Sequence, residues 1–293
     1  MIDDCSKDNS VNLIKKLMIK DPRIKLLQNE ENRGMLYTKT KGVLNSKGKY
    51  VMLLDEDDIY VQKDAFLTLY LEAEENNLDI IGYAQTWSNI HLEKNKNKLG
   101  EYIETPIIIQ PNVKKRMYDY GPNGEVKQTG GFIRNYFFKT EIFIKSIKQI
   151  NDNFLNIKMN YHDDFLLFFL ISRNAYSYKH IKRIFYVVFD WTSKYNAQIK
   201  FRSNEKEKNK DNLSCFAYLS YIEFILIKTD NTVIDKKIAS FELEKWFLNH
   251  GCRKNKFIRN QGINLCKLFL ENEYIENSIK NKITTFLKEI NST

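Results

Sequence analysis

The sequence predicts an α/β protein with a mostly parallel sheet, followed by a helical C-terminal region. Residues 1–57 alternate between short apolar runs and amphipathic stretches, the order expected of strands and helices in a layered α/β domain. Residues 50–54 are continuously apolar, which is typical of a strand buried on both faces. Beyond residue 204 the periodicity becomes helical. We therefore expect two regions, 1–204 and 205–293.

The first region begins at Ile2, which reads as the end of a strand. Asp8 or Ser10 can cap the helix that follows, and Asp21 with Pro22 ends it. The expected helices of this region are 11–19, 35–45, 64–77, 139–150 and 163–172, and its other expected strands are 24–28, 50–54, 79–84 and 181–189. The stretch 88–128 is polar and rich in loops.

The second region opens with a charged, linker-like stretch at 205–212. Four helices are expected after it, at 213–228, 233–249, 255–270 and 276–290, and Gly251 is suited to a helix stop. Aromatic residues recur along these helices at the spacing of a buried face, so they are expected to form core and are assigned no chemistry.

Composition excludes several classes of protein. The net charge of +9 suits anionic partners, but the lysines are interleaved with acids, so the charge is equally a bias of composition; we assign no nucleic-acid partner. The four cysteines form no C-x-x-C pair, which argues against a zinc site or a disulfide framework. No stretch approaches about 18 uninterrupted apolar residues, and the start lacks a leader peptide, so we expect a cytoplasmic protein, peripheral at most to a membrane.

Two acidic clusters follow expected strands: Asp3 with Asp4, and the run Asp55 to Asp58. Ligands of open α/β sheets bind at the carboxyl ends of strands. Four neighbouring carboxylates repel one another, and Mn²⁺ or Mg²⁺ would offset that charge while also binding the phosphate oxygens of a nucleotide diphosphate. The alternative is a solvated turn in which Asp58 caps a helix.

Several segments closely resemble, in order and spacing, the opening of family 2 glycosyltransferases, which are inverting enzymes with a GT-A fold. These segments are Ile2 to Ser10, Asn32-Arg33-Gly34, Lys39, Gly42, and Gly48 to Asp58. The resemblance implies transfer of a sugar from a nucleotide-diphospho-sugar, with UDP as the expected nucleotide, to an acceptor hydroxyl. It leaves open whether the acceptor is a glycan, a lipid or a protein.

The same resemblance assigns roles to the residues of these segments. Asp4 would contact the nucleoside base, with Asp3 beside it as support. Asp55 would lie near the ribose and the metal, and Asp57 would be the metal ligand. Lys39 stands where the family usually carries arginine at the nucleotide, which keeps the charge but loses the bidentate geometry.

A looser match lies further along, where Tyr161 to Phe168 resembles the family's G-E-D-W-x-F segment. It implies that Asp164 is the general base toward the acceptor hydroxyl. Asp163 and Gly131 would lie on the acceptor side. The alternative for Asp163 and Asp164 is the N-terminus of a helix, where carboxylates interact favourably with the helix dipole, and both interpretations can hold together. His162 and His180 are expected to be structural.

One part of the family pattern is not found: the apolar strand that precedes the Asp-Asp turn in family members. An internal start methionine, a shortened chain or a degenerate paralogue would each explain this, and we expect Ile2 to lack its neighbour in the sheet. A catalytically inactive module that binds a nucleotide-sugar or a glycan is therefore the main alternative. A receiver domain also places paired acids at a strand end, but it fits the Asn32-Arg33-Gly34 segment less well.

Overall fold

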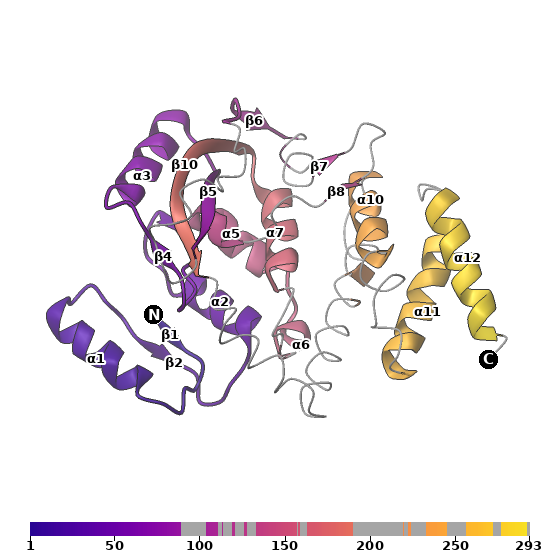
Figure 1. Cartoon of the computed structure of the whole chain (residues 1–293), viewed down its shortest axis with the longest axis horizontal. Coiled ribbons are helices and arrows are strands. Elements are labelled where there is room, and N and C mark those ends of the chain that lie inside the picture. Colours follow the sequence, from indigo (N-terminus) through magenta and orange to yellow (C-terminus); the bar gives the residue numbers. More distant parts are fainter. Residues whose placement is uncertain are drawn as a thin grey trace. The chain divides into compact units, whose positions relative to one another are not determined.

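The computed structural model describes residues 1–88, 104–110, 113, 119–120, 126–127, 133–156, 158, 163–189, 219, 222–223, 233–244, 256–271 and 277–291 (Figure 1). The chain divides into two compact units. The first contains residues 1–114 and 130–203, and the second contains 115–129 and 204–293. The second unit thus combines the C-terminal region with a short segment from the polar stretch 88–128.

Apart from the short α6 (Asp152–Leu155), which was not predicted, the helices of the first unit lie where the sequence predicts them. They are α1 (Ser10–Lys20), α2 (Met35–Leu44), α3 (Ala65–Asn76), α5 (Thr140–Ile147) and α7 (Asp163–Asn174), with a 3-10 turn, η1 (Ile133–Asn135). The N-cap of α1 is Asn9, whose side chain makes no capping bond. The Asp8 carboxylate instead accepts a hydrogen bond from the Ser10 N–H. Gly34 precedes α2 with φ of 85°, a conformation that favours glycine.

The strands of the first unit form two sheets. β1 (Ile2–Asp3) and β2 (Leu27–Gln28) pair in parallel. The larger sheet has the order β3-β9-β5-β10-β4, with β6 also paired to β10. Its strands are β3 (Tyr50–Val51), β4 (Ile59–Tyr60), β5 (Ile80–Ser88), β6 (Ile108–Ile109), β9 (Tyr136–Lys139) and β10 (Ser177–Phe189). β5 and β10 form its long parallel pair, and the shorter strands add antiparallel partners.

The expected strand at 50–54 is wrong in length and burial. Only Tyr50 and Val51 are extended, paired with β9, and Leu54 is 53% exposed. In the described part of the chain, no strand links β3 to the β1–β2 pair. Ile2 is not without a neighbour, however, because it pairs with Leu27 and the end of its side chain lies close to Gly42 of α2. A larger residue at position 42 would have to displace that side chain.

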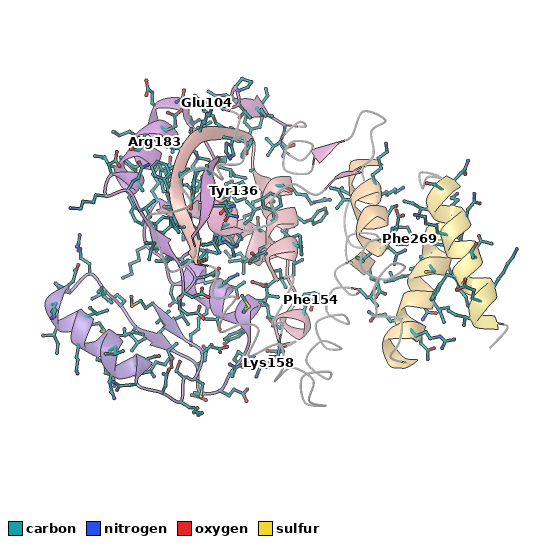
Figure 2. The ribbon with its side chains drawn as sticks, viewed as in Figure 1. Glu104, Tyr136, Phe154, Lys158, Arg183 and Phe269 are labelled. Atoms are coloured by element: carbon teal, nitrogen blue, oxygen red, sulfur yellow. The ribbon has the colours of Figure 1, made fainter. Side chains whose placement is uncertain are left out.

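Helices cover both faces of the larger sheet: α3 lies on one side of β5 and β10, and α5 and α7 lie on the other (Figure 1). Alternation along the strands explains this arrangement. Ile81 and Tyr83 join a buried cluster with α3. On the opposite face, Tyr136, labelled in Figure 2, packs against Phe168 of α7 with ring centroids 5.0 Å apart. Gly82 lies on this second face, where a Cβ would come within 2.7 Å of the His180 ring.

The second unit contains the hairpin β7 (Asp119–Tyr120) and β8 (Val126–Lys127), together with helices α10 (Val233–Glu242), α11 (Lys256–Leu270) and α12 (Asn277–Asn291). The buried residues of α11 and α12 recur every three or four positions, as the periodicity predicts. They are Leu265, Cys266, Phe269, Ile279, Ile283 and Phe286, of which Phe269 is labelled in Figure 2. The linker 205–212, most of 213–228, and Gly251 lie outside the described residues. No helix among the described residues has the length and apolar character needed to span a membrane.

Candidate functional site

The acidic turn, Asp55 to Asp58, follows β3 and is closed by a hydrogen bond from the Asp58 N–H to the Asp55 carbonyl at 3.2 Å. Tyr186 of β10 holds both ends of this turn. Its hydroxyl donates to the Asp58 carboxylate at 2.8 Å and accepts from the Asp55 N–H at 3.2 Å. Asp58 is therefore a buried anchor. The interpretation of Asp58 as a helix cap is wrong, since α3 begins only at Ala65, after Asp64.

A cation of the protein offsets part of the charge of the acidic turn. The guanidinium of Arg134, in η1, lies 3.3 Å from the Asp55 carboxylate, and its Nε donates to Gln85 at 3.4 Å. The same guanidinium lies over the ring of Tyr186 at 5.9 Å. The Arg134 side chain is only 13% exposed, so this pair is weakly screened by solvent.

Two further tyrosines connect the acidic turn to the core. The Tyr60 hydroxyl donates to the Leu53 carbonyl at 2.8 Å and lies 3.2 Å from the Tyr83 hydroxyl. The Tyr83 hydroxyl donates to the carbonyl of Arg134 at 2.6 Å. The chain before the turn and the arginine beside it are thus fixed by one buried hydrogen-bond network.

Asp57 and its neighbour Glu56 differ from Asp55 and Asp58 in being exposed. Within the described residues, the Asp57 carboxylate has no hydrogen bond or ion pair to another side chain. Partial burial of the carboxyl group raises the pKa of Asp57, and Glu56 adds to the rise. Asp57 and Glu56 are therefore the carboxylates of this turn that are open to an external cation.

A second group of charges joins α2 to the start of α7. The ammonium group of Lys39 lies 2.8 Å from the Asp163 carboxylate and 2.6 Å from the Asp164 carboxylate. Asp163 and Asp164 are the first residues of α7, so the helix-terminus interpretation is correct. The second oxygen of Asp164 faces the Ile133 N–H at 3.4 Å.

The pKa shifts of this group reflect burial and charge. Burial raises the pKa of Asp164 to about 6; Asp163 adds to the rise and Lys39 opposes it. Burial by itself lowers the pKa of Lys39, but the surrounding carboxylates raise it above its ordinary value. These carboxylates belong to Asp163, Asp164 and Asp55. Lys39 thus interacts electrostatically with residues of both the acidic turn and the start of α7.

The carboxylates of the first acidic pair, Asp3 and Asp4, are both hydrogen-bonded within the protein. The Asp4 carboxylate accepts hydrogen bonds from the N–H groups of Arg33 and Gly34 at 2.7 and 2.9 Å, and from the Asn29 side chain at 2.8 Å. Asp3 is buried, and its carboxylate accepts from the Ser6 N–H at 3.2 Å. Asp4 therefore fixes the Asn32-Arg33-Gly34 loop against β1 in this structure.

Of the residues singled out in the sequence, Gly131 and His162 lie outside the described residues. His180 lies in β10, where its N–H donates to Thr105 at 2.8 Å. Sequence reasoning missed the part that Arg134 and Tyr186 play in holding the acidic turn. Tyr186 stood out only as one residue of an expected strand, and Arg134 only as a residue near Gly131, in the segment that the resemblance puts on the acceptor side.

Comparison with known proteins finds a family similarity over the first part of the chain. Residues 1–139 match the profile described as Glycosyl transferase family 2. Glycosyltransferase GlyG of Streptococcus pneumoniae is 33% identical over 81 residues, which are 28% of this chain and 27% of that protein. The uncharacterized glycosyltransferase MJ1057 of Methanocaldococcus jannaschii is 26% identical over 163 residues, which are 56% of this chain and 47% of that protein. The chain thus spans half or less of these relatives.

Solved structures share the fold. S. aureus TarS, residues 1–349 in complex with UDP, matches with a TM-score of 0.60 and 15% identity, over 96% of this chain and 72% of that chain. TarS 1–349 in a second crystal structure gives a TM-score of 0.58. This likeness extends through the helical C-terminal region. Residues 1–139 are therefore similar to glycosyl transferase family 2, and the chain has a GT-A α/β fold with a helical C-terminal portion.

Proposed function

We propose that the chain binds a UDP-sugar with a divalent cation at the acidic turn and transfers the sugar, with inversion, to an acceptor hydroxyl. One observation carries the proposal: Lys39 brings the charges of Asp55 and Asp164, 109 positions apart in the chain, into one electrostatic cluster. These are the residues that the family resemblance assigns to the donor and to the general base. The UDP bound to TarS supports uridine as the donor nucleoside.

The residues present fit a metal that is shared with the donor. Among the described residues, no three His, Cys, Asp or Glu side chains are grouped as a metal site, so the protein would supply only part of the coordination. Mg²⁺ is commonly held in this way, by one or two carboxylates together with phosphate oxygens and water. Asp57 would be the ligand from this chain, and the bound Mn²⁺ or Mg²⁺ would offset the charge on the diphosphate leaving group.

The protein's part in the transfer would rest on Asp164. Its carboxylate would take the proton from the acceptor hydroxyl as that oxygen bonds to the anomeric carbon. The bond from this carbon to the diphosphate oxygen breaks in the same displacement, and its electron pair leaves with UDP. A single displacement inverts the anomeric configuration. A pKa of about 6 suits a base that works near neutral pH.

The donor itself would lie between the first loops and the acidic turn. Asp55, held by Arg134, would face the ribose, and the loop that Asp4 fixes would border the base. Asp163 would lie on the acceptor side, beside Asp164. The acceptor is a glycan, a lipid or a protein that offers a hydroxyl group.

A donor-binding module without catalysis is the second candidate. The observation that favours it is the separation of the β1–β2 pair from the larger sheet among the described strands. The two parts of a donor site would then be joined less rigidly than in one continuous sheet. Such a module would bind UDP but release no sugar.

Turnover separates the two candidates. The chain is incubated with Mn²⁺, a panel of UDP-sugars and simple hydroxyl acceptors, and UDP release is followed together with the anomeric configuration of the product by NMR. We expect release that is abolished by Asp164→Asn and unaffected by Asp152→Asn, an exposed acid at the start of α6. UDP binding without release under any condition would favour the binding module.

A further inference from the structure

Lys39 is placed to act on the proposed base. It projects from α2 to the first turn of α7, where its ammonium group contacts both Asp163 and Asp164. The three side chains are 13%, 3% and 16% exposed, in the order Lys39, Asp163, Asp164. Ion pairs this deeply buried are poorly screened and costly to break.

One anion and one cation lie next to the Asp164 carboxylate. Asp163, on the same helix, is a second buried anion beside it, and Lys39 from α2 is the cation that contacts both. From η1, the Ile133 N–H faces Asp164, and the neighbouring Arg134 is paired with Asp55. Removing the Lys39 charge would leave two adjacent buried carboxylates that share one helix N-terminus. One of them would then hold a proton near neutral pH.

We propose that Lys39 is a positioning residue for Asp164: it keeps this base in its carboxylate form and fixes it at the start of α7, with Asp163 as the opposing charge. This inference rests on the proposed function and deepens it. It moves Lys39 from the nucleotide, where the family resemblance put it, to the acid pair. Asp163 then raises the basicity of Asp164, and Lys39 limits that rise.

The ligand-free protein provides the direct test. The carboxyl carbons of aspartate are labelled with ¹³C in the full chain, and Asp164 is titrated by NMR, with Asp164→Asn to assign its signal. We expect Lys39→Met to raise the pKa of Asp164 by about 1–3 units, because an opposite charge at this distance lowers a carboxyl pKa by that amount. Asp163→Asn should lower the pKa of Asp164. Lys39→Arg keeps the positive charge, so the pKa of Asp164 in this variant should be closer to the wild-type value than in Lys39→Met.

Opposite shifts are the decisive readout, since a merely structural lysine would not produce them. An unchanged pKa of Asp164 in both Lys39→Met and Asp163→Asn, or a shift of the same sign in both, would overturn the inference. If Lys39→Met does not fold, the variants Asp163→Asn and Lys39→Arg still test the inference. In that case, a pKa of Asp164 that does not fall in Asp163→Asn would count against the inference.

Titration with UDP distinguishes a failure of this inference from a failure of the proposed function. We expect Lys39→Met to bind UDP with Mn²⁺ within about threefold of the wild type, since the lysine serves the acid pair. A loss of UDP affinity of tenfold or more, with the pKa of Asp164 unchanged, would make Lys39 a donor ligand and refute the inference. Opposite NMR shifts in a chain that binds no UDP would support the role of Lys39 and count against the proposed function.

Discussion

Replacing Asp4 with alanine tests whether this residue anchors its loop as the structure indicates. The Asp4 carboxylate accepts three hydrogen bonds at 2.7 to 2.9 Å, two of them from backbone N–H groups that precede α2. A net contribution of about 1 kcal/mol per bond is appropriate, because the side chain is half-buried. Asp4→Ala should therefore destabilise the protein by about 3 kcal/mol.

Differential scanning calorimetry measures this loss. For a unit of this size, 3 kcal/mol corresponds to a Tm lower by about 6–12 °C. Glu30→Ala is the matched control, because it removes an exposed carboxylate from the same loop, and it should leave Tm unchanged. Hydrogen exchange at the Arg33 and Gly34 amides should accelerate in Asp4→Ala alone, which would show that the loop itself has been released.

The reasoning would be refuted if Asp4→Ala and Glu30→Ala had the same Tm and the same exchange rates. A protein of unchanged stability that had lost only its UDP affinity would instead return Asp4 to the role that the family resemblance gives it, contact with the nucleoside base. The structure predicts that Asp4→Ala is less stable than the wild type even when no ligand is present.

Three further outcomes follow from the geometry. Tyr186→Phe removes the hydroxyl that holds both ends of the acidic turn, so UDP affinity with Mn²⁺ should fall by about tenfold in calorimetric titration, and an unchanged affinity would argue against this anchor. Gly82→Ala places a Cβ 2.7 Å from the His180 ring and should lower the free energy of unfolding by about 1–3 kcal/mol in urea titration, whereas equal stability would mean that the ring moves freely. Since Asp164 acts as a carboxylate and burial raises its pKa to about 6, kcat/KM should fall as the pH is lowered through about 6; a profile flat from pH 5 to about 8 would contradict its role as the base.

The sequence predicted the helices of the first unit well, because their apolar spacing and turn residues are local signals. Helix α1 begins and ends within one residue of the predicted bounds, and α7 begins where the paired acids stand. The strand at 50–54 was predicted poorly, since the length of a strand depends on its partners. Only Tyr50 and Val51 find one, in β9.

For the candidate site, too, some residues could be predicted from the sequence and others could not. Acids at strand ends are visible in sequence, and the structure places Lys39 in contact with Asp164 and near enough to Asp55 for their charges to interact. The cation beside Asp55 is not visible, because Arg134 stands 79 positions away and only the folded sheet makes it a neighbour. The sequence argument asked for positive charge at the acidic turn and assigned all of it to a metal. Arg134 supplies part of that charge.

Calorimetric titration of UDP into the 293-residue chain tests the central claim most directly. It is done with Mn²⁺, with EDTA in place of the metal, and with the variants Asp57→Ala and Glu56→Ala, which remove neighbouring carboxylates of the same turn. We expect saturable binding that needs the metal and Asp57 but survives Glu56→Ala. A folded chain that binds no UDP, or binds it equally well with EDTA and in Asp57→Ala, would contradict a metal-assisted donor site at the acidic turn.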